Sequence, residues 1–390
     1  MFEISQHTLG ILGGGQLGKM LLEVANRWNL ETIILDPSLD CPCRNLTGHF
    51  QQGDFRDYQT VLEFGKKCTV LTFEIEQVNI DALYELQDKH QVQVYPSPDT
   101  LSIIRDKSVQ KTFFETHQIP TSPFTSYTYL PQLTTLDTPK FWKKNTMGYD
   151  GYGVKKITRV TDLEGLPDSP CLLEDMVSIK RELSVIVCRD TNGILKTYPP
   201  VEMIFDPTSN QVTLVTTLIH DSQTHILEKA LDVAKRVSNI ISHVGLLAVE
   251  LFQTTQDEII VNELAPRPHN SGHLTLSYNV SQFEQHLRAI LGFPLVDPIF
   301  NRSAVMLNIN GRLYDNLIRS EYLKSILGLF TNYEVSLYLY GKKVSRTNRK
   351  MGHLTILPQH QNTTTTTDTT TSMECLLEQV NRLKKLLSNN

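Results

Sequence analysis

In GLLAVELFQTTQDEIIVNELAPRPHNSGHLT, residues 245–275, acidic side chains interrupt two apolar runs. Glu250 lies within the first run, and Glu263 lies at the end of the second, so the pattern indicates a hairpin of two strands. If QTTQDE closes the hairpin as an even-length loop, Glu250 faces Val261, and Glu263 lies diagonally across on the same side. An odd-length loop would turn one glutamate to the other face, so this register is a test of the arrangement.

Two carboxylates and an amide on one side of a sheet would repel each other without a cation. Oxygen ligands that leave part of the coordination shell open suit Mg²⁺, or Mn²⁺ in its place, bridging nucleotide phosphates. We therefore predict Glu250 and Glu263 as metal ligands. The irregular segment that follows supplies four further polar side chains, Arg267, His269, Asn270 and His273. Donors beside a metal pair suit a small anion held next to the γ-phosphate, although each one alone also fits a plain polar loop.

The first part of the chain predicts a βαβ unit. Residues 8–12 form an apolar strand, Gly13-x-Gly15-x-x-Gly18 follows, and a helical apolar stripe leads to a second strand that ends at Asp36. The glycines fit three interpretations: a dinucleotide fingerprint with Asp36 on the ribose, a plain turn, or a helix N-terminus that holds the phosphate of a mononucleotide substrate.

The middle of the chain contains a glycine loop and a pair of acids. In PKFWKKNTMGYDGYGVKKI (139–157), Lys143 is expected on a strand before a loop that could close over a polyphosphate, or form only a hairpin. Asp150 in this loop makes more sense facing a second substrate that bears an amine. Glu174 and Glu182 could accept from the amine or ribose hydroxyls of a nucleotide, or be solvated.

Composition limits the class of protein. The chain has 390 residues, 40% apolar and 20% charged, which suits a globular protein of two or three domains. Its net charge of -5 does not favour nucleic acid, and no apolar run is long enough to span a membrane, so we expect a cytoplasmic protein without membrane partners. The six scattered cysteines are expected to be free thiols.

Three domains are expected, at residues 1–98, 99–300 and 301–390. The second is expected to begin with a helix from Asp99 to His117. The third contains a threonine-rich tract at 362–372, predicted to be a flexible loop, and a final helix. The apolar stripe of that helix should pack on the third domain and consists of Leu376, Val380, Leu383 and Leu387.

Five motifs together resemble a known enzyme family. GGGQLGKM, GYDGYG, NELAPRPHNSGH, SQFEQHLRAILGFPL and RKMGH look like the 5-(carboxyamino)imidazole ribonucleotide synthases of the ATP-grasp superfamily, and the resemblance spans about residues 8 to 357. It implies a mixed α/β and α+β fold: a Rossmann-like parallel sheet, a central ATP-grasp domain and a small β-rich C-terminal domain. It also implies a homodimer that uses ATP and bicarbonate to carboxylate 5-aminoimidazole ribonucleotide in purine biosynthesis, through carboxyphosphate.

The resemblance also implies a role for each site residue. The ATP site would comprise Lys107, Lys143, Gly148, Tyr149, Gly151, Gly153, Glu174, Val177, Glu182 and Asn262. Arg267, His269 and Asn270 would cradle bicarbonate or carboxyphosphate, with Asp150 as a fourth catalytic residue. The aminoimidazole substrate would meet Gly15, Gln16, Leu17, Tyr149, Asp150, His273, Lys342 and Arg349.

Some features depart from this family, and other functions stay open. Tyr152 stands where a basic residue is usual, Met147 where a small one is usual, and the threonine tract lies outside the family pattern. The alternatives are an NAD(P)-dependent oxidoreductase that uses the first glycine turn, a formate- or biotin-dependent ATP-grasp enzyme, and a nucleotide-binding protein without catalysis.

Overall fold

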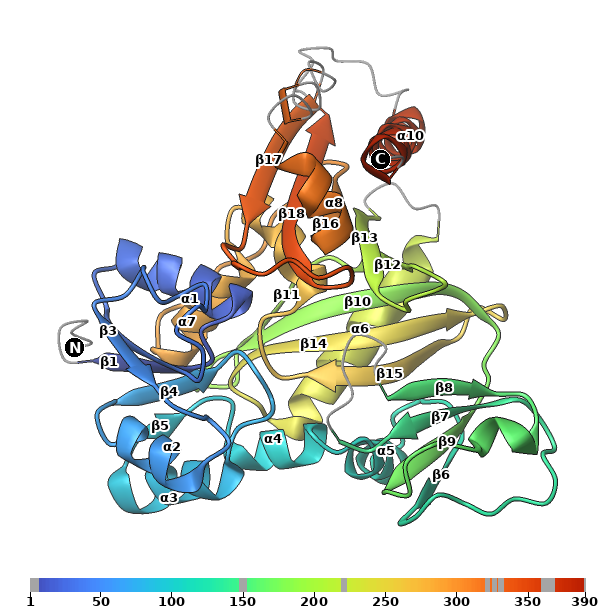
Figure 1. The fold of residues 1–390 in the computed structure, drawn as a ribbon, viewed down its shortest axis with the longest axis horizontal. Helices are drawn as coiled ribbons and strands as arrows, with labels where there is room; N and C mark the ends of the chain where they lie inside the picture. Colours follow the sequence, from blue (N-terminus) through green and yellow to red (C-terminus); the bar gives the residue numbers. More distant parts are fainter. Residues whose placement is uncertain are drawn as a thin grey trace.

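The computed structural model describes residues 7–146, 153–218, 223–319, 323–324, 328, 333–358 and 369–388. Figure 1 shows a parallel sheet formed by the first part of the chain, a large antiparallel sheet at the centre, and a small sheet at the lower right. The C-terminal strands rise above the central sheet in this view. The three-domain layout expected from the sequence is confirmed, while the domain boundaries stay predictions.

The N-terminal sheet has the order β3-β2-β1-β4-β5, and all its strand pairs are parallel. Its strands are β1 (Thr8–Leu12), β2 (Glu31–Asp36), β3 (His49–Gln52), β4 (Val70–Phe73) and β5 (Gln93–Val94). The connecting helices are α1 (Gln16–Arg27), α2 (Tyr58–Gly65) and α3 (Ile80–His90). Leu17, Leu21 and Val24 bury the apolar stripe of α1 against the sheet, so the predicted βαβ unit is confirmed.

The helix expected from Asp99 to His117 is wrong, because the structure has two helices there. These are α4 (Pro98–Ile104) and α5 (Lys107–Thr116). Asp106 separates them, because its carboxylate accepts hydrogen bonds from the N–H groups of Ser108 and Val109 and so starts a new helix. The break places Lys107 in the first turn of α5, which is the end of the helix that faces the cleft described below.

Two further sheets enclose the cleft. The small sheet has the order β6-β9-β7-β8, with β6 (Phe124–Tyr127), β7 (Lys140–Lys144), β8 (Val154–Ile157) and β9 (Cys171–Asp175). The large sheet has the order β15-β14-β10-β12-β13-β16-β18-β17, with β11 paired to β10. Its strands are β10 (Ile179–Arg189), β11 (Leu195–Thr197), β12 (Val201–Phe205), β13 (Val212–Thr217), β14 (Gly245–Thr254), β15 (Ile259–Ala265), β16 (Val305–Asn310), β17 (Tyr333–Leu339) and β18 (Lys350–Pro358).

Alternation along β10 and β14 separates the core from the site. Helix α6 (Thr224–Ile241) packs on one face of these strands. That face consists of Leu183, Val185, Val187, Leu247, Val249 and Leu251. Because successive side chains of a strand point to opposite faces, Glu182, Ser184 and Glu250 lie on the other face. The strand pairing puts Ser184 directly opposite Glu250.

The C-terminal part continues the large sheet, since β13 pairs with β16. The 3-10 helix η3 (Asn270–Ser277) and helix α7 (Gln282–Ile290) connect the hairpin to this part, and α8 (Gly311–Leu317) and α10 (Thr369–Ser388) pack against it. The expected docking of the last helix is confirmed, because Leu376, Val380, Leu383 and Leu387 are buried against β16 and β18. Within the described part of the chain, no helix combines the length and apolar character that crossing a membrane requires.

A buried histidine of helix α7 lies within hydrogen-bond distance of both the N-terminal sheet and the large sheet. His286 Nδ1 accepts a hydrogen bond of 3.1 Å from the Leu246 N–H of β14. Its Nε2 lies 2.9 Å from Thr72 Oγ1 of β4. Because Nδ1 is an acceptor, the neutral ring carries its proton on Nε2 and donates it to the threonine. Burial lowers the pKa of His286 to about 3, so the ring is neutral in the folded protein at neutral pH.

We predict that His286 makes stability fall as the pH is lowered below 6.5. Above this ordinary value the ring is neutral in both states, whereas below it only the unfolded chain takes up the proton. Between pH 7 and pH 5 this difference should cost about 2 kcal/mol of unfolding free energy. The His286→Gln variant, whose amide can still accept and donate but cannot titrate, should lose about 2 kcal/mol less than the wild type over this range in urea denaturation. Parallel losses would contradict this role.

Candidate active site

A β-bulge in the β14–β15 hairpin positions the two candidate metal ligands. The loop has an odd length, because Thr254 N–H donates to Glu258 O at 3.0 Å and Asp257 has a positive φ of 58°. The expected even-length loop is therefore wrong. Leu251 pairs with Val261, but the register then shifts and Glu250 pairs with Glu263. Asn262 is the extra residue of the bulge. Without the shift in register, Glu263 would point to the opposite face of the sheet; with it, Glu263 lies on the same face as Glu250.

Glu250 and Glu263 thus stand directly opposite each other, which confirms that both side chains point to the same side. In the structure each has a cationic or proton-donating partner. His269 Nε2 lies 3.2 Å from Glu250 Oε1, and the ammonium of Lys107 forms an ion pair with Glu263. Burial opposes ionisation of Glu263, but Lys107 and Lys143 outweigh it and lower the pKa of its carboxyl.

Glu182 brings a third carboxylate to this face. Burial raises the pKa of Glu182, the charges of Glu250 and Glu263 add to the shift and Lys143 opposes it, so that the pKa is about 7. The carboxylates on this face therefore repel one another. A divalent cation would relieve the repulsion, so the donor set fits Mg²⁺. In the described part of the chain no group of three His, Cys, Asp or Glu side chains has metal-site geometry. Glu250 and Glu263, which pair across the bulge, are the candidate ligands.

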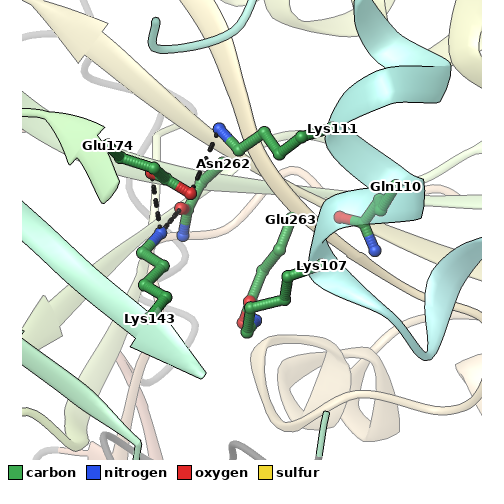
Figure 2. A pocket seen from close by; sticks show the side chains of 7 residues that line it. All are labelled: Lys107, Gln110, Lys111, Lys143, Glu174, Asn262 and Glu263. Atoms are coloured by element: carbon green, nitrogen blue, oxygen red, sulfur yellow. Dashed lines mark hydrogen bonds and ion pairs between the residues drawn. The ribbon is translucent and has the colours of Figure 1, made fainter. Parts of the chain in front are cut away.

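A chain of charges lines the floor of the site (Figure 2). Lys143 Nζ lies 3.0 Å from Glu174 Oε2 and donates to Asn262 Oδ1 at 3.1 Å. Lys111, on α5, approaches the same carboxylate from the other side, with Nζ 3.5 Å from Glu174 Oε1. The predicted ATP residues Lys107, Lys143, Glu174 and Asn262 therefore come together, and Lys111 joins them without having been predicted.

The segment after β15 places its polar side chains in two different environments. Arg267 Nε lies 3.0 Å from Glu76 Oε1, and the Asn270 amide exchanges hydrogen bonds of 2.9 and 2.7 Å with Asn308 of β16. Arg267, His269 and Asn270 all line the cleft. His273 does not: it is completely buried, and its ring stacks on His353 at 4.8 Å between centroids. His273 was expected to contact the substrate, but in the structure it lies in the core.

The first glycine turn holds the protein's own carboxylates. Glu74 accepts from the N–H groups of Gly15 at 2.7 Å and of Leu17 and Gly18 at 3.1 Å, while Asp36 accepts from Gly14 N–H at 2.7 Å. A Cβ at Gly15 would collide with the Glu74 carboxylate, which explains the glycine there. In this structure the amides of the turn already have an anion, so a phosphate would have to displace Glu74 or Asp36, and the phosphate and dinucleotide interpretations of the turn stay predictions.

The remaining expected residues fall into three groups. Gln16, Leu17, Val177 and Glu182 line the cleft. Lys342 and Arg349 do not: Lys342 donates to Lys350 O at 2.8 Å, and the exposed Arg349 donates to Val344 O at 2.8 Å. Gly153 ends the glycine loop with a positive φ of 80°. Met147, Gly148, Tyr149, Asp150, Gly151 and Tyr152, as well as most of the threonine tract, lie outside the described residues.

All three parts of the fold contribute to one cleft of about 920 Å³. Sequence reasoning missed Glu74, Glu76, Lys111 and Lys350. The two acids had a usable signal, because they follow directly after the apolar strand β4, where the carboxyl ends of parallel strands meet a ligand. Lys111 had none, since a lysine in an amphipathic helix is usually solvated.

Comparison with known families defines the class of protein. Residues 6–105 match the family model described as a ribonucleotide synthetase preATP-grasp domain, and residues 112–283 match the ATP-grasp domain. Residues 304–367 match the phosphoribosylaminoimidazole carboxylase C-terminal domain. These matches agree with the parallel sheet, the two sheets around the cleft and the C-terminal strands described above. The fold is that of an ATP-grasp protein.

The similar proteins narrow this class to one family. The chain is 33% identical to the N5-carboxyaminoimidazole ribonucleotide synthase of Bacillus subtilis, and the alignment covers 90% of this chain and 92% of that relative. The N5-carboxyaminoimidazole synthase of Aspergillus clavatus, solved with ADP and 5-aminoimidazole ribonucleotide, has a TM-score of 0.81 and 30% identity, with 96% and 99% of the two chains covered. The chain belongs to the N5-carboxyaminoimidazole ribonucleotide synthase family.

The family also includes longer proteins. The chain is 36% identical to the phosphoribosylaminoimidazole carboxylase of Candida glabrata over 91% of its own length. It spans 64% of the length of that relative. The similarity therefore covers only part of the longer protein.

We predict that Glu74 is required for the stability of the first glycine turn. Glu74→Ala leaves the buried N–H groups of Gly15, Leu17 and Gly18 without their acceptor, which should lower the unfolding free energy by about 2–4 kcal/mol. Glu74→Gln keeps one acceptor oxygen and should lose about half as much. Urea denaturation at pH 7.5 measures both, and a loss below about 1 kcal/mol for the alanine variant would show that water replaces the carboxylate.

Proposed function

We propose that the protein carboxylates 5-aminoimidazole ribonucleotide with ATP and bicarbonate, giving N5-carboxyaminoimidazole ribonucleotide, ADP and phosphate. The observation that supports this proposal best is the meeting of Glu250 and Glu263 across the bulge, with His269 and Arg267 beside them in the same cleft. Lys107 and Lys143 supply the positive charge that a triphosphate needs in this place. The names of the family relatives agree with this reaction.

Two lysines would bind the phosphates, and both are held in place before ATP arrives. Glu174 and Asn262 fix the ammonium of Lys143, so little side-chain entropy remains to be lost on binding. Lys107 is the counter-ion of Glu263 in the structure. Val177 and Glu182 line the cleft at the start of β10, where the resemblance places adenine and ribose, and these two contacts stay predictions.

Glu250 and Glu263 would hold Mg²⁺, while the amide oxygen of Asn262 keeps its hydrogen bond from Lys143. The ion would neutralise charge on the phosphate oxygens during transfer, and Mn²⁺ could replace it because both prefer oxygen ligands. With Glu263 bound to a divalent cation, Lys107 is free to pair with a phosphate instead.

The chemistry proceeds in two displacements. An oxygen of bicarbonate attacks the γ-phosphorus, the bond to the β-phosphate oxygen breaks, and ADP leaves with carboxyphosphate formed. The amine nitrogen of the aminoimidazole then attacks the carboxyl carbon, and phosphate leaves while the nitrogen loses a proton. Arg267 and His269 lie where they can hold the anion, and His269 can donate from Nε2 because its Nδ1 accepts from the Ser271 N–H at 3.4 Å.

Asp150 would orient the amine of the second substrate, and Tyr149 with the glycine loop would exclude water from carboxyphosphate. The homodimer is also proposed from the family resemblance alone, and sedimentation of the purified protein tests it. The oxidoreductase alternative has lost its main support, since the amides of the first glycine turn are occupied by Asp36 and Glu74.

The test of the function is ADP release measured with each substrate omitted in turn. We expect release that requires ATP, bicarbonate and 5-aminoimidazole ribonucleotide together, with stoichiometric phosphate. Release with formate or biotin in place of bicarbonate and the aminoimidazole would assign a different ATP-grasp enzyme. ATP binding without ADP release in the complete mixture would show a nucleotide-binding protein without catalysis.

We predict that Glu263→Gln lowers kcat by at least about 100-fold at 5 mM Mg²⁺, because the amide removes one charged ligand from the metal pair. Raising the Mg²⁺ concentration should recover part of the rate. The matched control is Glu258→Gln, which changes an exposed glutamate in the turn of the same hairpin and should leave kcat unchanged. Unchanged ADP production by Glu263→Gln would contradict the assigned ligand.

A further inference from the structure

Lys111 is a buried lysine for which the proposed reaction has so far no use. It lies on the second turn of α5, and only 2% of its surface is exposed. Its ammonium donates to Thr121 Oγ1 at 2.7 Å and to Ser122 Oγ at 2.8 Å, and it lies 3.5 Å from Glu174 Oε1. A lysine almost never occupies such a buried position unless a nearby group of opposite charge pairs with it.

Glu174 is the carboxylate that pairs with Lys111, and it also pairs with Lys143. The carboxylate is 3% exposed and lies between two ammonium groups, with Lys143 at its Oε2 and Lys111 at its Oε1. Ser122 Oγ donates to Oε2 at 3.0 Å. Two lysines and one glutamate leave one net positive charge at the floor of the cleft (Figure 2).

We propose that Lys111 is a positioning residue that neutralises Glu174, so that Lys143 keeps its positive charge for the phosphates of ATP. This inference rests on the proposed function. Without Lys111, Glu174 would have Lys143 as its main cationic partner, and the buried pair would be neutral. A polyphosphate would then meet no net attraction at this position, although Lys143 would still be present.

The ionisation of Lys111 agrees with this role. Burial lowers its pKa to about 8, the charge of Glu174 opposes this shift, and Lys143 and Lys107 add to it. Burial is the main cause of the low value, and the neighbouring ammonium groups of Lys143 and Lys107 contribute less. The groups that face Lys111 are Glu174 on β9, Lys143 on β7, Lys107 on its own helix, and the hydroxyls of Thr121 and Ser122.

The test compares Lys111→Met with the double variant Lys111→Met/Glu174→Gln. The single variant should raise the dissociation constant of Mg·ATP, measured by calorimetry, by about tenfold or more, because it cancels one charge next to the phosphates. The KM for ATP should rise equally, while the KM for 5-aminoimidazole ribonucleotide stays unchanged. The double variant should bind ATP more tightly than the single variant, because Glu174 no longer needs a counter-ion and its glutamine can still accept from Lys143.

Controls separate this charge effect from a packing defect. Lys140→Met removes a lysine on the same strand as Lys143, where it pairs with Asp175 at 2.5 Å, and should leave ATP binding unchanged. A purely structural role of Lys111 predicts that the double variant binds no better than the single one, and this result would overturn the proposal. Equal ATP affinity of Lys111→Met and wild type would also overturn it. A wild-type protein that binds no ATP would instead contradict the proposed function.

Discussion

The site depends on one extra residue in one strand. The bulge at Asn262 returns Glu263 to the face of Glu250, and the same residue provides the amide that holds Lys143. The bulged strand is at the edge of the large sheet, where Pro120 accepts from Val261 N–H at 2.7 Å and Gln110 accepts from Leu264 N–H at 3.0 Å. These contacts from α5 and the segment after it fix the irregular strand, as expected for bulges beside functional sites.

Charge neutrality organises the rest of the cleft. In the structure every carboxylate of the predicted metal pair has a partner from another element, His269 for Glu250 and Lys107 for Glu263. Glu174 is shared by two lysines, and Glu76 of the N-terminal part pairs with Arg267. Nucleotide and metal would replace these internal partners rather than enter an empty site. The charged side chains of the site are therefore largely desolvated when the protein folds, so that the site is preorganised before its ligands bind.

Much of the site could be predicted because its residues follow apolar strands in the sequence. Glu250 and Glu263 were chosen as candidates because they interrupt or end an apolar run, Lys143 because it precedes the glycine loop, and Arg267 because it follows the hairpin. The structure brings all four to one cleft. The errors have physical causes. The even-length loop failed because Asp257 adopts a positive φ, which closes a three-residue turn. His273 failed because neighbouring residues of a 3-10 helix point in different directions, and this one points into the core. The internal partner of the first glycine turn was not predicted, because Glu74 lies 59 residues from Gly15 in the sequence.

The parallel sheet, the hairpin, the strand that carries Lys143 and the family resemblance follow from the amino-acid order alone, because local periodicity or a contiguous motif indicates each of them. The pairing of each carboxylate with its cation depends on how the chain folds. The pairs Lys111–Glu174, Lys107–Glu263 and Glu76–Arg267 join elements from different parts of the chain. Such pairs follow from the packing of α5 and the N-terminal sheet against the hairpin, and no spacing along the chain encodes a distance between two side chains that folding brings together.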